Sequence, residues 1–137
     1  MERLALLTKR FHFEAAHSLP GHLGKCARLH GHSYTLEVTL RGPVKQVPGA
    51  SDDGMVMDFE DLSRLVRQAV LERLDHQDLN EVTGIRTTAE NLAHWIWDAL
   101  LQAGLPEELL YRLCLWETAQ GRVEITAAER GQRAEER

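Results

Sequence analysis

The clearest pattern in the chain is an alternation of apolar and polar positions over residues 30–40. One parity holds the residues that can line a buried face: His30, His32, Tyr34, Leu36, Val38 and Leu40. A period of two is typical of a strand that buries one face and exposes the other. Residues 6–16 are a second predicted strand, because Phe11 and Phe13 lie two positions apart within an extended pattern.

Two later segments carry the spacing of amphipathic helices. After Asp58, a suitable N-cap, apolar residues recur three and four positions apart: Leu62, Leu65, Val66, Ala69, Val70 and Leu74. A second helix is predicted from an N-cap at Thr88 to Gln102, and it has its own apolar face: Leu92, Ile96, Trp97, Leu100 and Leu101. Gly104 and Pro106 mark where it ends.

Two further strands are predicted at residues 109–117 and 123–127, joined by a turn at Gln120 and Gly121. The order is then strand, strand, helix, helix, strand, strand. This order predicts an α+β domain with a four-stranded antiparallel sheet and two helices on one face. We expect residues 1–127 to form this single domain and residues 128–137 to be a charged, flexible tail. The open edges of such a sheet favour oligomerisation.

Composition narrows the functional classes. A chain of 137 residues with 43% hydrophobic and 27% charged residues is typical of one globular domain and excludes a wholly disordered chain. It has neither an apolar run of the ~20 residues that a membrane span needs nor a signal-peptide pattern. We therefore expect a soluble cytoplasmic protein without a membrane partner. The net charge of −5 argues against a nucleic-acid surface.

Histidine is the unusual residue, with seven in the chain and five between positions 12 and 32. His30 and His32 leave the same face of a strand with Cα atoms about 6.5–7 Å apart, so both rings can reach one ion. Burial disfavours their protonation and keeps them competent as ligands. His17 reaches the same point if the first two strands pair antiparallel. Three histidines predict a Zn²⁺ site with an open fourth position.

Each histidine can instead be a separate, hydrogen-bonded side chain, which is the expectation for His12 and His22. Cys26, four residues before His30, has three interpretations. It is a fourth zinc ligand that closes a structural site, a thiolate activated by nearby cations, or an inert small side chain. The last is expected for Cys114, in the middle of a predicted strand.

Several motifs together resemble one family over residues 8–120. They are F-x-F-x-x-A-H at 11–17, C-x-x-x-H-G-H at 26–32, G-M-V-M-D-F at 54–59, L-D-H-Q-D-L-N at 74–80, T-A-E-N at 88–91 and W-E-T at 116–118. This ordered set resembles the 6-pyruvoyl-tetrahydropterin synthase family, including its bacterial branch, the 6-carboxytetrahydropterin synthases of queuosine biosynthesis. The resemblance implies the tunnelling fold (T-fold) and a hexamer with active sites at subunit interfaces.

The resemblance also implies a set of functional residues: His17, His30 and His32 as ligands of catalytic zinc, Cys26 as the proton-abstracting thiolate, Asp75 and His76 as a charge-relay pair, Glu117 as the carboxylate that anchors the pterin ring, and Thr88 and Glu90 beside the same pocket. The implied substrate is 7,8-dihydroneopterin triphosphate. The queuosine enzymes release acetaldehyde and triphosphate from it. Since the chain is acidic overall, we expect local cations such as Lys25, Arg28 and Arg10 to offset the triphosphate charge.

The residues themselves leave alternatives open. Glu117 shares the parity of an apolar strand face, where a carboxylate needs a donor-rich partner such as a pterin, but it can also emerge into solvent at the strand end. His76, at a helix end, can simply interact with the helix dipole. Thr88 and Glu90 also make a good helix start.

The predicted reaction is formation of 6-carboxytetrahydropterin. One alternative is the pyruvoyl-forming reaction on the same substrate, and another is a non-catalytic zinc-binding module closed by Cys26. A third is action on another pterin that feeds folate synthesis. Family members of that kind often carry glutamate where Cys26 stands, which argues against it here.

Overall fold

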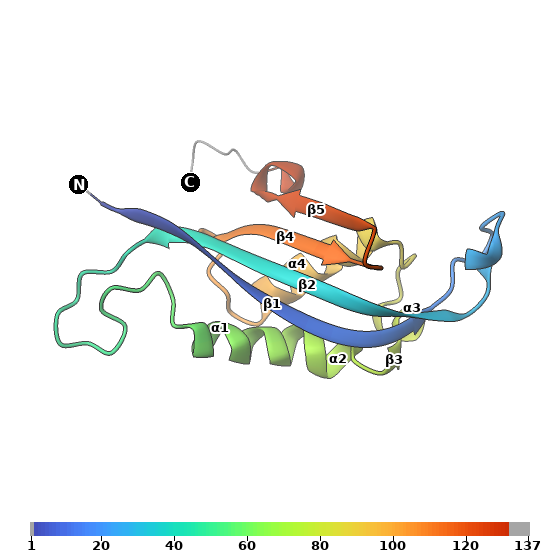
Figure 1. Cartoon of the computed structure of the whole chain (residues 1–137), viewed down its shortest axis with the longest axis horizontal. Helices are drawn as coiled ribbons and strands as arrows, with labels where there is room; N and C mark the ends of the chain where they lie inside the picture. The colour runs from blue at the N-terminus through green and yellow to red at the C-terminus, as the bar shows by residue number, and fades with distance from the viewer. Residues whose placement is uncertain (1, 132–137) are drawn as a thin grey trace.

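The structure, a computed structural model, describes residues 2–131 (Figure 1). The strands are β1 (Leu4–His17), β2 (His30–Pro43), β3 (Gln77–Asp78), β4 (Leu110–Trp116) and β5 (Arg122–Thr126). The α-helices are α1 (Phe59–Val66), α2 (Glu72–Leu74), α3 (Leu79–Thr83) and α4 (Ala89–Gln102). The π-helical segment η2 (Arg67–Leu71) joins α1 to α2, and η1 (Lys25–Ala27) and η3 (Ala127–Arg130) are 3-10 helices.

The strands form one sheet in the order β3-β1-β2-β4-β5. The four long strands pair antiparallel, as predicted, with β1 and β2 in register from Leu4 opposite Pro43 to His17 opposite His30. The prediction missed β3, which pairs parallel with Ala15 and Ala16 and makes the sheet mixed. A strand of two residues is too short to show an alternation of apolar and polar positions, so the sequence alone does not reveal β3. It forms because the chain returns beside β1 after α2.

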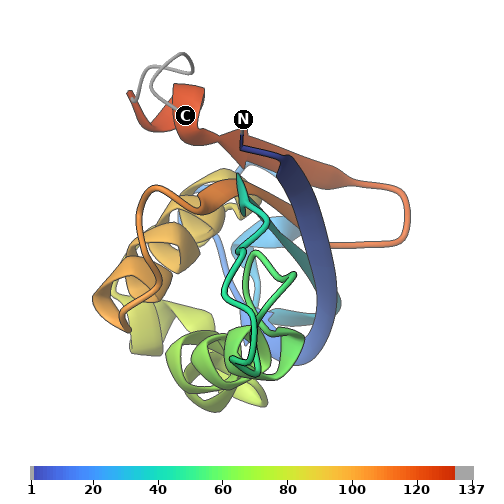
Figure 2. The ribbon, with the colours of Figure 1, turned by 90° about the vertical axis from the view of Figure 1, so that its left-hand side faces the viewer.

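All the long helices cover one face of the curved sheet (Figure 2). The predicted alternation in β2 is confirmed, because its apolar positions from Tyr34 to Leu40 are fully buried beneath the helices. They pack in one core with buried helix residues, among them Leu62, Val66, Leu74, Leu92, Ile96, Trp97 and Leu100. This packing holds β1 and β2 rigidly and so positions the end of the hairpin that carries the histidines.

Both predicted helix starts are confirmed. The carboxylate of Asp58 accepts a hydrogen bond from the Glu60 amide at 2.7 Å, and the Thr88 hydroxyl accepts one from the Asn91 amide at 3.1 Å. The first helix differs from the prediction in its middle, where η2 widens it.

The first residues of the predicted flexible tail are helical in the structure. Residues 127–130 form η3, which begins with a capping box between Thr126 and Glu129. The remainder of the expected tail, residues 132–137, lies outside the described residues. Among residues 2–131, none of the helices combines the length and apolar character needed to cross a membrane.

Candidate metal centre and active site

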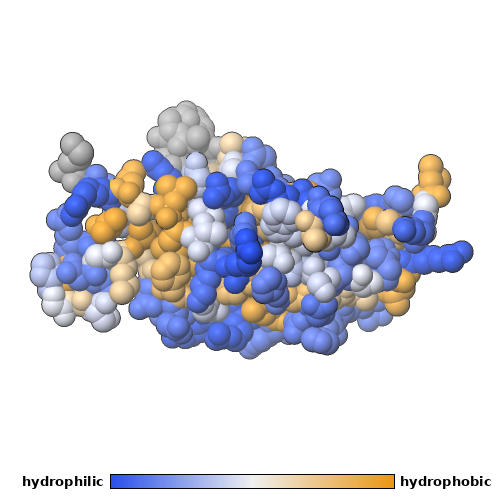
Figure 3. Space-filling view, in the orientation of Figure 1, coloured by the Kyte–Doolittle hydropathy of each residue, from blue (hydrophilic) through white to orange (hydrophobic). Residues whose placement is uncertain are grey.

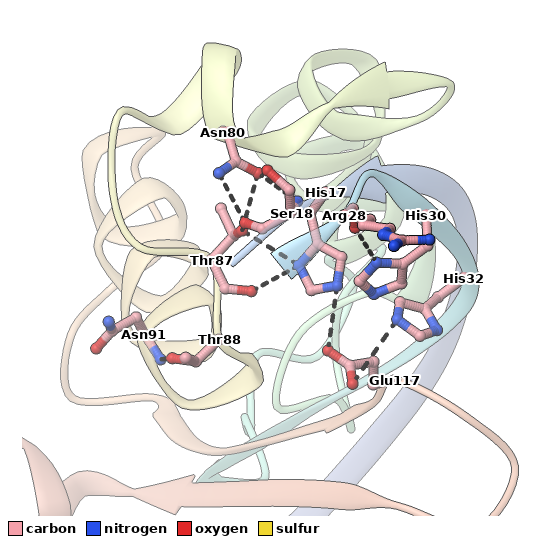
Figure 4. A network of polar contacts seen from close by, with 10 residues as sticks. All are labelled: His17, Ser18, Arg28, His30, His32, Asn80, Thr87, Thr88, Asn91 and Glu117. Atoms are coloured by element: carbon pink, nitrogen blue, oxygen red, sulfur yellow. Dashed lines mark hydrogen bonds and ion pairs between the residues drawn. The ribbon is translucent and has the colours of Figure 1, made fainter. Parts of the chain in front are cut away.

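The structure brings the three predicted metal ligands together at one end of the β1–β2 hairpin (Figure 4). Antiparallel register places His17 directly opposite His30, and His32 follows on the same face. The ring centroids lie 4.6 to 5.1 Å apart, and one ligand atom from each ring lies within 4.8 Å of the others. Three imidazoles from two adjacent strands therefore converge on one point.

Hydrogen bonds determine which ring nitrogen is free. Nδ1 of His17 lies 2.8 Å from the Thr87 carbonyl oxygen, and Nδ1 of His30 lies 2.7 Å from the Arg28 carbonyl oxygen. A carbonyl only accepts, so each Nδ1 carries the proton and each Nε2 keeps its lone pair.

Within residues 2–131, Nε2 of His17 and Nε2 of His32 are buried and have no hydrogen-bond partner. Buried polar atoms without a partner are rare and costly. A metal cation at the point of convergence would give both nitrogens a partner, so the donor set fits a metal ion.

The surroundings of His32 favour its neutral form, which is the form that can bind a metal cation. Burial lowers the pKa of His32; Glu117 opposes this effect, and the neighbouring histidines add to it. A lowered pKa leaves His32 neutral near pH 7, the state in which it can donate a lone pair. Two more features of the site, a carboxylate and a thiol, lie beside the histidines.

The carboxylate is Glu117, which directly follows β4 and is one-third exposed. Its oxygens lie 3.7 Å from Nε2 of His17 and 3.8 Å from Nε2 of His32. The turn after β4 is closed by a hydrogen bond from the Glu117 amide to the Gly121 carbonyl at 3.1 Å, and the side chain faces the metal centre. Both distances exceed those of a hydrogen bond, so the carboxylate still has capacity to accept from a bound ligand.

The thiol is Cys26 in η1, which lines a pocket of about 380 Å³ together with Lys25, His30 and His32. Cys26 is partly exposed and is not bonded to Cys114. In the described part of the chain, the potential metal-ligand group consists of the three histidines and does not include Cys26. The Cys26 thiol therefore lies in the pocket beside the histidines and is not part of the potential ligand group.

Asp75 and His76 form a hydrogen-bonded pair just after α2. One carboxylate oxygen of Asp75 accepts from the Glu14 amide at 2.9 Å, and the other lies 3.0 Å from Nδ1 of His76. The Glu14 amide, followed by the bond to His76, lowers the pKa of Asp75. His76 has a positive φ of 60°, unusual for a residue other than glycine. The pair therefore presents the exposed Nε2 of His76 to the surroundings.

His76 and Cys26 do not share a pocket in the described chain. His76 lines a separate hollow of about 530 Å³ at the edge of the sheet, where its neighbours include Glu14, Ser33 and Asp78. Among the residues lining the two hollows, only His32 is common to both. A single chain therefore brings the histidines and Cys26 together and leaves the Asp75–His76 pair on another surface.

The remaining predicted residues have the local roles that the alternative interpretation describes. Thr88 caps α4, and Glu90 is an exposed residue in its first turn. Sequence reasoning missed Thr87, which is fully buried against His17, and gave Asn80 no role in the site. Their contacts with residues 17 and 18 span 62 to 70 positions, which no local pattern reveals.

The chain is similar in sequence to proteins named as pterin synthases. A family model described as 6-pyruvoyl tetrahydropterin synthase matches residues 6–128. A Synechocystis protein named 6-carboxy-5,6,7,8-tetrahydropterin synthase is 44% identical over 102 residues, 74% of this chain and 78% of the relative. A Dictyostelium discoideum protein named 6-pyruvoyl tetrahydrobiopterin synthase is 36% identical over 132 residues, 86% of this chain and 93% of the relative.

A solved structure leads to the same family. The structure of Caenorhabditis elegans 6-pyruvoyl tetrahydropterin synthase is similar with a TM-score of 0.80 at 26% identity, over 91% of this chain and 96% of that one. The predicted α+β fold class is thereby confirmed. The chain has the T-fold and belongs to the 6-pyruvoyl tetrahydropterin synthase family.

Proposed function

We propose that this protein is a zinc-dependent 6-carboxy-5,6,7,8-tetrahydropterin synthase. It converts 7,8-dihydroneopterin triphosphate with release of acetaldehyde and triphosphate, and serves queuosine biosynthesis in the cytoplasm. The coarser activity, that of a pterin synthase of the lyase type, follows from the family and from the names of the relatives. The observation that carries the proposal is the cluster of His17, His30 and His32 with the Glu117 carboxylate beside it.

The donor set favours zinc among the common metals. Three neutral imidazoles without a thiolate or a fixed carboxylate match the open three-ligand sites of catalytic zinc. When bound, zinc would supply Lewis acidity toward the hydroxyl groups of the substrate side chain. His17, His30 and His32 would hold it.

The other side chains supply the proton transfers and the substrate contacts. The Cys26 thiolate takes a carbon-bound proton at Sγ, next to the metal centre. Asp75 stays ionised because its pKa is lowered, and it holds Nδ1–H of His76 so that Nε2 can exchange a proton with a substrate hydroxyl. The Glu117 carboxylate accepts from the exocyclic amine and a ring N–H of the pterin, while Thr88 and Glu90 border the pterin from the start of α4.

We also propose that the working form is a homo-oligomer, a hexamer, with each site completed by a second chain. The supporting observation is that Cys26 and His76 line different hollows of one chain. Among the described residues, β3 covers the outer edge of β1 only at Ala15 and Ala16, which leaves most of that edge unpaired. Apolar side chains gather near the N-terminal half of β1 (Figure 3), among them the half-exposed Leu4 and Leu6. A neighbouring chain would bury them.

The pyruvoyl-forming reaction is the second candidate, favoured by the name of the Dictyostelium relative. It uses the same substrate and the same residues, so the two differ only in whether the side chain of the substrate is cleaved. A non-catalytic zinc module needs Cys26 as a ligand. The three-histidine cluster of the described residues, without Cys26, argues against it.

The deciding experiment is mass spectrometry of the pterin formed from 7,8-dihydroneopterin triphosphate by the zinc-loaded protein, with acetaldehyde assayed in the same reaction. We expect 6-carboxytetrahydropterin and an equimolar amount of acetaldehyde. A pyruvoyl product without acetaldehyde would move the protein to the other branch of the family. Absence of turnover at full zinc occupancy would contradict both activities.

A further inference from the structure

A set of buried and partly buried hydrogen bonds next to His17 joins three segments that are distant in the sequence (Figure 4). Nδ1 of His17 lies 2.8 Å from the carbonyl oxygen of Thr87 and 3.1 Å from its hydroxyl oxygen. His17 and Thr87 are both buried, at 1% and 0% exposure. Both acceptors on that side of the ring thus come from one residue in the loop before α4.

Asn80, at the start of α3, completes the set with both ends of its side-chain amide. Its Oδ1 accepts from the Ser18 amide at 3.0 Å and from the Thr87 hydroxyl at 3.1 Å, and its Nδ2 donates to the Ser18 carbonyl at 2.8 Å. The backbone directly after His17 is therefore held from both sides.

The direction of these bonds determines the state of the imidazole. The Thr87 hydroxyl lies 3.1 Å from Oδ1 of Asn80 and 3.4 Å from the Ser18 carbonyl oxygen. Both oxygens only accept, so the hydroxyl donates on that side, with Asn80 as the nearer acceptor, and turns a lone pair toward His17. The Thr87 carbonyl also only accepts. Nδ1 of His17 consequently carries the proton, and Nε2 presents its lone pair to the point where the three histidines converge.

We propose that Asn80 and Thr87 are positioning residues for the metal centre: together they hold His17 in the Nδ1–H tautomer with Nε2 directed at the metal. The inference rests on the proposed metal site and adds residues that sequence reasoning left without a role in it. It also connects that site to the start of α4, because Thr87 directly precedes Thr88.

Capping of α3 does not account for the contacts of the Asn80 side chain. The N-cap of α3 is Asp78, whose carboxylate accepts from the Asn80 backbone amide at 3.0 Å and does not use the Asn80 side chain. Asn91 offers a matched comparison. Its Nδ2 donates to the Arg86 carbonyl at 3.0 Å, and its backbone amide donates to the Thr88 hydroxyl, so its hydrogen bonds stay within the segment around the start of α4.

The test measures zinc affinity by chelator competition and the His17 tautomer by ¹⁵N NMR on the metal-free protein. We expect Asn80→Ala to weaken zinc binding about 10–100-fold, the usual effect of removing partners of a metal ligand. It should also convert His17 to a mixture of tautomers. Thr87→Val removes only the hydroxyl and should give a smaller loss, which Thr87→Ser restores. Asn91→Ala, the control, should bind zinc as the wild type does.

Wild-type zinc affinity and an unchanged tautomer in both Asn80→Ala and Thr87→Val would overturn the inference, even if their melting temperatures fell. If Asn80→Ala did not fold, Thr87→Val and its serine rescue would decide. If the wild type bound no zinc, the proposed function would fail. The tautomer measured on the metal-free variants would then still decide whether Asn80 and Thr87 position His17.

Discussion

The metal centre and the Asp75–His76 pair differ in how much of their geometry one chain supplies. His17 is 1% exposed and is held by hydrogen bonds to Thr87, whereas the His76 side chain is 77% exposed and contacts the carboxylate of Asp75. The first arrangement is rigid because strand register, core packing and buried hydrogen bonds agree. The second presents a ring nitrogen outward. The difference teaches that one chain brings the three potential metal ligands together, whereas it leaves His76 of the Asp75–His76 pair in a separate hollow.

The largest expected effects come from two substitutions that distinguish a metal ligand, His17, from the thiol of Cys26. His17→Ala should abolish zinc binding and activity together, because one of three ligands is lost. Cys26→Ala should keep full zinc content and lower kcat by about 10²–10⁴-fold, the usual contribution of a general acid or base. Zinc content by atomic absorption and steady-state kinetics measure the two effects. Loss of zinc in Cys26→Ala would instead make Cys26 a ligand.

The second prediction tests whether the two regions meet between chains. Cys26→Ala and His76→Ala should each be nearly inactive with zinc retained. After the two variants are unfolded together and refolded as mixed oligomers, activity should return to about a quarter of the wild-type value. One site in four then combines an intact Cys26 from one chain with an intact His76 from another. Refolding each variant alone is the control. No recovery in the mixture would place both residues in a site within one chain.

The smallest effect concerns the pH dependence of stability. The pKa of Asp75 is lowered in the folded state, so its ionised form stabilises the fold at pH values above its ordinary pKa of about 3.9. This contribution is lost as the pH falls through the folded-state pKa. Asp75→Asn should therefore be slightly less stable than the wild type at pH 7, and the difference should shrink below about pH 4. Urea denaturation at both pH values measures it, and a difference independent of pH would contradict the assignment.

Much of the fold was predictable because its signals are local. The alternation around Tyr34 and Leu36 identified β2 and its buried face, and the residues at Asp58 and Thr88 identified two helix starts. The short β3 had no such signal. The widened η2 was also missed, since its apolar residues keep a spacing that an ordinary α-helix satisfies equally well.

Part of the candidate site was likewise predictable from local spacing, and part of it was not. The spacing of His30 and His32 in a strand indicated that both rings leave one face, and antiparallel pairing with the first strand brought His17 to them. The partners Thr87 and Asn80 were not predictable, because they reach His17 and Ser18 from segments more than 60 positions away. The resemblance to a family indicated roles for Cys26 and His76 but not which of them one chain brings to the metal centre.

By itself, the sequence determined the four long strands, the two main helices, the face on which the histidines lie and the chemistry that they can perform. These follow from side-chain periodicity and residue type, which act within a few positions. Only the tertiary structure decided which nitrogen of His17 is free, where the Glu117 carboxylate lies, and that Cys26 and His76 occupy different surfaces. Those features depend on strand register and on how α3 and α4 pack against the sheet, which join residues far apart in the chain.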